Sequence, residues 1–174
     1  MTTVQHTRWA KSLATDIAFA EQILTSRGEL CPLFIIEAGG VKSFVEWKFP
    51  NTDSKRTILR VIQLLAIAVD AASITTITQD SQTIVTAAIV YRESGRVHAT
   101  QAVHPIERND QGQVTGLGPN NCDGDVPMEG RLTRLLPSVR PGPEQRAMAK
   151  ATFDDLPFLI RRSYAPKPVT ANPK

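Results

Sequence analysis

The first clear pattern along the chain is a set of apolar residues spaced three and four positions apart. These residues lie in segment 7–27 and are Trp9, Leu13, Ile17, Ala20 and Leu24. This spacing places them on one face of a helix. Gly28 follows directly, and glycine takes the left-handed conformation of a helix end without strain. The pattern predicts an amphipathic helix over 7–27.

The next pattern is typical of two strands. CPLFIIEA (31–38) is apolar and rich in β-branched residues, and VKSFVEWKF (41–49) alternates. One alternating set is Val41, Ser43, Val45, Trp47 and Phe49, and the other is Lys42, Phe44, Glu46 and Lys48. Strict alternation predicts a strand with one wet face. Gly39 and Gly40 suit a tight hairpin turn, because both turn positions take positive φ.

A second helical pattern and three strand patterns follow. SKRTILRVIQLLAIAVDA (54–71) carries an apolar face made of Ile58, Val61, Ile62, Leu65, Ala66 and Val69. SITTITQ (73–79), TIVTAAIVY (83–91) and VHATQAVHPI (97–106) are then separated by short polar turns. These segments predict a buried central helix and an antiparallel meander.

The order helix, strand, strand, helix and three strands predicts an α+β class with a mostly antiparallel sheet of about five strands. We expect one domain over 1–136, in which the glycine-rich segment 107–130 forms an irregular loop or a weak hairpin. Residues 137–174 are expected to form a basic, proline-rich tail. Pro143 begins a short predicted helix over 143–151, and the end, APKPVTANPK (165–174), is expected to be disordered.

This order resembles the roadblock and profilin-like layouts over residues 7–106. The resemblance implies an adaptor or dimerisation platform, not an enzyme. The hairpin, helix and meander followed by "PIERNDQGQVTGLGP" and "GRLTRLLP" also resemble uncharacterised phage-encoded proteins. Those proteins tend to carry an acidic-aromatic patch after the third strand, where this chain has Ile-Thr-Gln-Asp-Ser (77–81).

Composition adds a charge split to this picture. Residues 1–130 hold 11 Lys and Arg against 14 Asp and Glu, whereas residues 131–174 hold 9 against 3. The basic end is either a solvated terminus or a surface for nucleic acid or an acidic partner. The apolar runs are too short for a membrane helix, and the N-terminus lacks a signal-peptide pattern. We therefore expect a cytoplasmic protein.

The loop GLGPNNCDGDVPMEGRL (116–132) is the first candidate site. Asp123, Asp125 and Glu129 are hard oxygen ligands of the kind that calcium and magnesium bind. However, Val126 and Leu132 occupy the positions where an EF-hand needs glycine and glutamate. The loop residues also satisfy ordinary turn chemistry, so we expect a turn-rich loop and no metal.

The second candidate site is a nucleophile at Cys122. A cysteine nucleophile needs a base and a third group that orients the base. His104 and Asp123 are the available partners. His98 lies on the same strand face as His104 but six residues away, which is too far for a shared ligand. Cys31 is expected to be a small core residue.

The third candidate is a cluster of cations. Lys55, Arg56 and Arg60 lie at the start of the central helix, where phosphate can bind. No glycine-rich loop precedes them, so we expect no nucleotide and no other cofactor.

The expected function is a non-enzymatic binding or adaptor module that uses its sheet face or basic tail for a protein partner or self-association. The tail residues expected to bind the partner are Arg131, Arg134, Phe158, Arg161 and Arg162. The segment that holds the last three, DDLPFLIRRSY (154–164), either folds back on the body or docks into a partner. Two alternatives stay open. One is association with nucleic acid through 131–162, and the other is a small hydrolase or transferase that uses Cys122 and His104.

Overall fold

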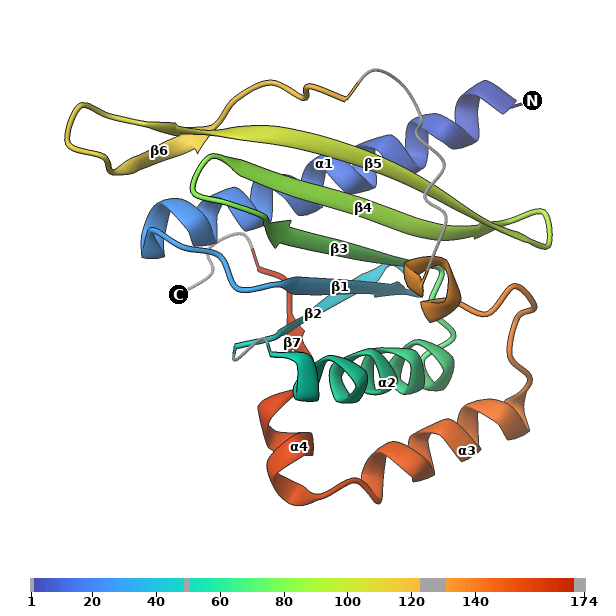
Figure 1. Ribbon diagram of the computed structural model, residues 1–174. Helices are drawn as coiled ribbons and strands as arrows, with labels where there is room; N and C mark the ends of the chain where they lie inside the picture. Colours follow the sequence, from blue (N-terminus) through green and yellow to red (C-terminus); the bar gives the residue numbers. More distant parts are fainter. Residues whose placement is uncertain (1, 49–50, 123–130, 171–174) are drawn as a thin grey trace.

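The structure, a computed structural model, describes residues 2–48, 51–122 and 131–170. In these residues an antiparallel sheet is sandwiched between helices in an α+β fold (Figure 1). α1 (Thr2–Arg27) covers one face of the sheet, and α2 (Thr52–Ala68) covers the other. The short 3-10 helix η1 (Arg131–Leu135), α3 (Pro143–Asp154) and α4 (Phe158–Ser163) follow, and α3 and α4 lie on the far side of α2. No helix of the described residues is long and apolar enough to span a membrane.

The described part of the chain forms one seven-stranded sheet, so the expectation of five strands is wrong. The strands are β1 (Leu33–Ala38), β2 (Val41–Glu46), β3 (Ser73–Gln79), β4 (Ile84–Glu93), β5 (Arg96–Arg108), β6 (Val114–Leu117) and β7 (Lys167–Pro168), in the order β6-β5-β4-β3-β1-β2-β7. All neighbouring strands are antiparallel. The two additional strands, β6 and β7, lie at the edges and have only four and two residues. Such short strands show no alternating pattern by which the sequence could reveal them.

Both faces of the sheet are buried. Leu33 and Ile35 pack against α1, whereas Phe34 and Ile36 pack against α2, and none of the four is more than 3% exposed. This arrangement explains why β1 is continuously apolar, since a strand covered on both faces has no wet side. Burial of each such side chain stabilises the fold by about 1.5–3 kcal/mol.

The predicted apolar face of α1 is confirmed. All five residues of that face are at most 8% exposed: Trp9, Leu13, Ile17, Ala20 and Leu24. The helix begins at Thr2, five residues before the predicted start. The ring of Trp9 stacks on that of Tyr91 in β4 at 4.9 Å, which fixes the helix against the sheet.

The β1–β2 hairpin is also confirmed, but its wet face is not. Gly39 and Gly40 have φ of +57° and +78°, as the tight turn requires. Lys42, Phe44 and Glu46 face α1, where the Phe44 ring lies 5.1 Å from that of Phe19. The alternation was misleading because α1 supplies charged partners for Lys42 and Glu46, which the strand by itself does not reveal.

The apolar face of α2 is confirmed except at its end. Ile58, Val61, Ile62, Leu65 and Ala66 are at most 7% exposed. Val69 is the residue that follows the last turn and is 48% exposed. The Asn51 side chain begins the helix by accepting a hydrogen bond of 2.8 Å from the Ser54 amide.

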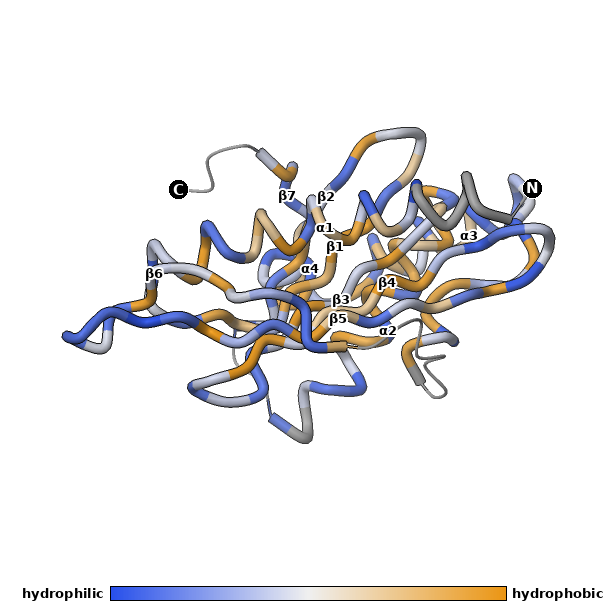
Figure 2. Tube along the Cα trace, turned by 90° about the horizontal axis from the view of Figure 1, so that it is seen from above, coloured by the Kyte–Doolittle hydropathy of each residue, from blue (hydrophilic) through white to orange (hydrophobic). Residues whose placement is uncertain are grey.

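The chain after residue 106 is more ordered than expected over the described residues. β6 pairs with the end of β5, as in the weak-hairpin alternative, and this hairpin projects with a hydrophilic tip (Figure 2). α3 includes the predicted helix over 143–151. β7 pairs with β2, and the Val169 amide donates to Lys42 O at 3.1 Å, so the expected disorder is wrong for these residues. Residues 123–130 and 171–174 lie outside the described ranges.

The segment 154–164 folds back on the body. Leu156, Ile160 and Tyr164 are partly buried against the core beside α2. Phe158 and Leu159 point outward and are 63% and 72% exposed. Some apolar residues of this segment therefore belong to the protein's own core, and the others remain on its surface.

Candidate functional site

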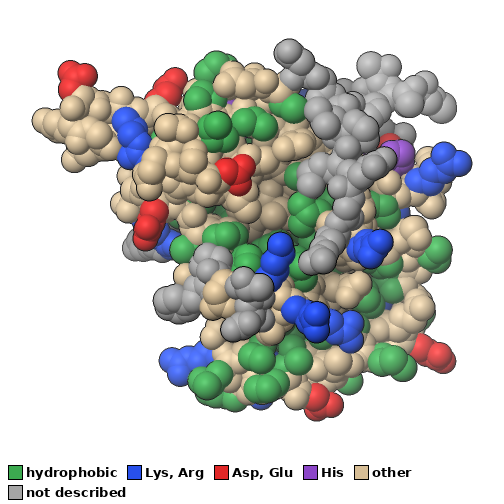
Figure 3. Space-filling view, in the orientation of Figure 1, with side chains coloured by type: hydrophobic (Ala, Val, Ile, Leu, Met, Phe, Trp, Pro, Cys, Tyr) green, Lys and Arg blue, Asp and Glu red, His purple; other side chains and the backbone are tan. Residues whose placement is uncertain are grey.

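Four cations from two distant segments form the most distinctive surface feature, which we call the basic face. It consists of Lys55, Arg56 and Arg60 of α2 and Arg134 of η1. These side chains line a pocket of about 440 Å³, together with Leu59, Gln63 and Leu135. Figure 3 shows Lys and Arg side chains gathered where α2 and η1 lie.

The charges of the basic face are not neutralised within the described structure. All four residues are exposed. None forms an ion pair with another described residue, since the ion pairs found there all lie elsewhere. Because all four residues are exposed, an external anion can reach their side chains.

The position of these charges does not stabilise α2. Lys55 is the fourth residue of α2 and lies in its first turn, where the helix dipole disfavours a cation. Arg56 and Arg60 are four residues apart, so they repel each other along one side of the helix by about 0.2–0.5 kcal/mol. A stabilising role for these charges is thus unsupported, and anion binding offers a physical reason for their presence.

Core packing brings Arg134 to α2. Leu135 and Leu136 are at most 4% exposed in the core beside α2, and Gln63 Nε2 donates to Arg134 O at 3.4 Å. Along the sequence, Lys55, Arg56 and Arg60 form one cluster and Arg134 belongs to the basic C-terminal segment. No spacing signal could have joined them, because more than seventy residues separate the two segments.

The other tail cations are largely engaged within the protein. Arg140 Nε lies 2.5 Å from Asp70 Oδ2, and Arg146 Nη1 lies 3.7 Å from the same oxygen. Lys150 pairs with Asp154 at 2.7 Å. The tail is thus bound to the body by charge, and it does not present a free row of arginines.

Phe158, Arg161 and Arg162, which were also predicted to bind a partner, do not line the pocket of the basic face. Arg161 Nε donates to Leu156 O at 2.9 Å, which closes the turn before α4. Arg162 and Phe158 are exposed on α4. The side chain of Arg131 lies outside the described structure.

Asp70 is the centre of the internal charge cluster. It has a φ of +54° and follows α2 directly. Arg92 Nη1 lies 3.7 Å from Asp70 Oδ1, and Arg92 Nε donates to Pro137 O at 2.9 Å. We call Asp70, Arg92, Arg140 and Arg146 the Asp70 clamp, because they join the sheet, the loop after α2 and the C-terminal segment.

A second pocket brings together two predicted site residues. His104 and Cys122 both line a cavity of about 540 Å³ between α1 and β5, with Leu13 and Ile17 among its apolar walls. His104 Nδ1 lies 2.8 Å from Gly118 O. A carbonyl oxygen only accepts, so Nδ1 carries the hydrogen and Nε2 is the basic nitrogen of the neutral ring. Asp123 and Asp125, the other members of this candidate site, lie outside the described residues.

His98 has a different environment from His104. Its ring stacks on Tyr91 at 5.4 Å, and Tyr91 stacks in turn on Trp9. His98 therefore belongs to an aromatic stack against α1. Among the described residues, no group of three or more His, Cys, Asp and Glu side chains could hold a metal ion.

A buried carboxylate on α1 was not identified by the sequence analysis. Asp16 is 1% exposed, and its oxygens lie 2.7 Å from Lys42 Nζ and 2.6 Å from Thr75 Oγ1. Burial raises the pKa of Asp16, and the bonds from Lys42 and Thr75 offset that rise only in part. In the sequence, Asp16 stands between the apolar positions 13 and 17 of the predicted helix, which indicates that its carboxylate is buried. The helix pattern does not show that Lys42 and Thr75 bind it.

Neither Cys31 nor Cys122 forms a disulfide in the structure. Burial raises the pKa of Cys31, and the nearby Glu46 carboxylate raises it further. A thiol with a raised pKa is less reactive near neutral pH. Cys31 is therefore a poor nucleophile, in line with the structural role expected for it, although it is only partly buried.

Comparison with known proteins returned no match. The chain matches no protein-family model, no curated protein sequence and no solved structure.

Proposed function

We propose that the protein is a non-enzymatic binding module that holds an acidic partner protein on its basic face. The observation that carries this proposal is the set of four exposed cations around one pocket without a neutralising acid among the described residues. Lys55 in the first turn and the repulsion between Arg56 and Arg60 are each unfavourable for α2, so anion binding offers a reason for these cations. α1 and α2 cover the two sheet faces, which favours a partner surface on the helices over one on the open sheet.

Nucleic acid is the main alternative ligand for the same cations, because arginine and lysine also attract phosphate. However, the residues that line the pocket include no aromatic side chain on which a base could stack. This favours a partner recognised by its carboxylates over a single-stranded nucleic acid.

The test compares two anionic polymers by fluorescence anisotropy. Labelled poly-L-glutamate is expected to bind with a steep dependence on salt, and labelled oligo-dT of equal charge is expected to bind more weakly. Arg56→Gln combined with Arg134→Gln should lower the affinity for polyglutamate by about tenfold. Stronger binding of oligo-dT would favour the nucleic-acid alternative.

The matched control is Arg162→Gln combined with Lys167→Gln, which changes the net charge equally at exposed positions near α4. We expect this pair to lower the affinity by less than about twofold. Equal losses in the two variants would show that net charge alone drives binding, and the basic face would then have no specific role.

A small hydrolase is a second candidate, favoured by the pocket that His104 and Cys122 share. In this alternative His104 Nε2 would take the thiol proton as the sulfur attacks the ester carbonyl, the alcohol would leave with that proton, and water would then cleave the thioester to release the acid. Hydrolysis of p-nitrophenyl acetate that disappears in Cys122→Ser and in His104→Gln would support it. Equal rates in the wild type and both variants would exclude it.

A further inference from the structure

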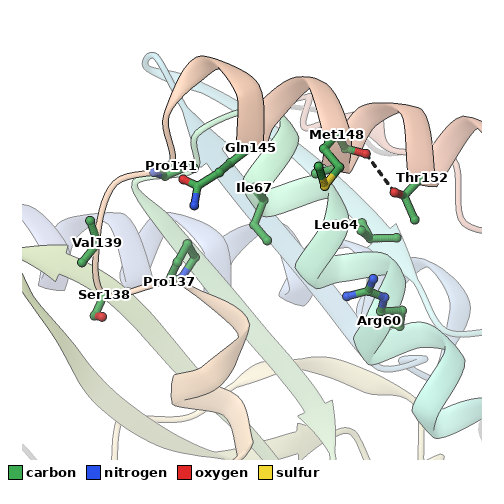
Figure 4. Close-up of a pocket in the computed structure, with 11 residues that line it drawn as sticks. Arg60, Leu64, Ile67, Pro137, Ser138, Val139, Pro141, Gln145, Met148 and Thr152 are labelled. Carbon is green, nitrogen blue, oxygen red and sulfur yellow. Dashed lines mark hydrogen bonds between the residues drawn. The ribbon is translucent and has the colours of Figure 1, made fainter.

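A largely apolar groove lies between α2 and α3. It has a volume of about 490 Å³, within the range of small-molecule sites. Leu64 and Ile67 of α2 line one side and Met148 of α3 lines the other (Figure 4). The linker 137–141 closes one end with Pro137, Val139 and Pro141, whereas Arg60 lies at the opposite end.

The groove exposes apolar side chains to water. Met148 is 71% exposed and Val139 is 77% exposed, and both line the groove together with the buried Leu64 and Ala149. Exposed apolar side chains that line one groove contribute favourable free energy when a ligand removes them from water. An occupant with an apolar body would supply that cover.

Two of the polar side chains that line the groove, Gln145 and Thr152, have hydrogen-bond partners. Gln145 Oε1 accepts from the Gly142 amide at 2.9 Å, and Thr152 Oγ1 donates to Met148 O at 2.8 Å (Figure 4). Arg60 has no ion pair with a described residue and lines both this groove and the pocket of the basic face. The groove therefore combines an apolar body with a cation at one end.

We propose that this groove binds a single-chain alkyl carboxylate, that is, a fatty acid. The alkyl chain would lie between α2 and α3 and cover Met148 and Leu64. The carboxylate would pair with the guanidinium of Arg60, whose planar set of donors suits two carboxylate oxygens. This ligand is distinct from the acidic partner of the proposed function, although Arg60 is common to both surfaces.

The test is isothermal titration calorimetry of the full chain with sodium decanoate below its micelle concentration. We expect saturable one-to-one binding. Decyltrimethylammonium has the same alkyl chain and a cationic head, so it should bind at least about tenfold more weakly. No decanoate binding, or equal binding of both probes, would overturn the proposal.

Three variants locate the site. Arg60→Gln should weaken decanoate binding by about tenfold, and Met148→Glu should weaken it at least as much, because it places a like charge in the groove. The matched control, Arg56→Gln, lies one turn earlier on α2 and outside the groove, and it should change the affinity by less than about twofold. Decanoate binding that is unaffected by both Arg60→Gln and Met148→Glu would also overturn the proposal.

Different variants test the polyglutamate site and the decanoate site, so either proposal can be contradicted without the other. Arg56→Gln with Arg134→Gln should abolish most polyglutamate binding and leave decanoate binding intact. Met148→Glu should have the opposite effect. Because Arg60 and Met148 are exposed, these variants should fold, and an unchanged thermal midpoint would verify it.

Discussion

At the scale of single residues, Asp16 shows how burial and pairing compete. Its carboxylate is almost fully enclosed between α1 and the sheet, yet Lys42 is only 2.7 Å away. The pKa of Asp16 is nevertheless raised, because the loss of water around the charge outweighs the attraction to Lys42. The environment therefore favours the neutral carboxyl more than water does.

This balance predicts unequal costs for two substitutions. Asp16→Asn should lower the free energy of unfolding at pH 7 by less than Asp16→Ala does, because asparagine keeps the acceptor for Thr75 and fills the same space. Asp16→Ala should cost about 3 kcal/mol, because it leaves a cavity and a buried hydroxyl without its acceptor. Urea unfolding measures both. Equal costs would mean that the ion pair with Lys42 is the main contribution.

The same raised pKa sets the direction of a pH effect. Below the unfolded-state value of 3.8 the carboxyl is protonated in both states, and its favourable contribution is fully present. As pH rises through the folded pKa, the folded state must release a proton that it binds more tightly than the unfolded state does, so stability falls. The wild type should therefore gain stability over Asp16→Asn as pH falls towards 3.8. A difference that is constant over this range would contradict the direction of the shift.

At the scale of elements, different residues of α2 serve stability and the proposed binding. Its apolar face is well packed, but its first turns carry Lys55 and Arg56 at the end where the dipole disfavours cations. The double substitution Lys55→Glu and Arg56→Glu should raise the free energy of unfolding by about 0.5–1 kcal/mol. Thermal unfolding at low salt measures this change in stability. The double glutamine variant should have a stability between those of the wild type and the double glutamate variant. A destabilised glutamate variant would indicate that these cations have a structural role.

The elements also show which patterns the sequence makes visible. α1, α2 and β1 to β5 have enough residues for a hydrophobic period, and their positions were predicted closely. β6 and β7 were missed as strands of the sheet because backbone hydrogen bonds to neighbouring strands define them. Their side chains carry no comparable signal. The short helix α4 was foreseen only as an apolar segment with two alternative destinations.

At the scale of the whole molecule, the Asp70 clamp determines where the C-terminal segment lies. Asp70→Asn should lower the free energy of unfolding by about 2 kcal/mol, because Arg92 is largely buried and would lose its anion. Asparagine tolerates the positive φ at this position, so backbone strain should not contribute. Hydrogen exchange in α3 should become faster as the segment loosens.

The control for this prediction is Arg140→Gln. The Arg140 side chain is 75% exposed, so its ion pair should contribute less than about 1 kcal/mol despite the short distance to Asp70. A larger effect for Arg140→Gln than for Asp70→Asn would place the main anchor at the surface and not at Arg92.

The sequence by itself determined the α+β class, the order of the main elements and the apolar faces of both long helices, because local periodicity records which side of an element is buried. It also identified Lys55, Arg56 and Arg60 as a cluster, since they are close along the chain. Only the tertiary structure decided that Arg134 joins them, that His104 and Cys122 share a pocket, and that Arg140 and Arg146 form ion pairs with Asp70. These contacts connect residues far apart in the chain, and their partners are chosen by packing and charge in three dimensions, which no local pattern records.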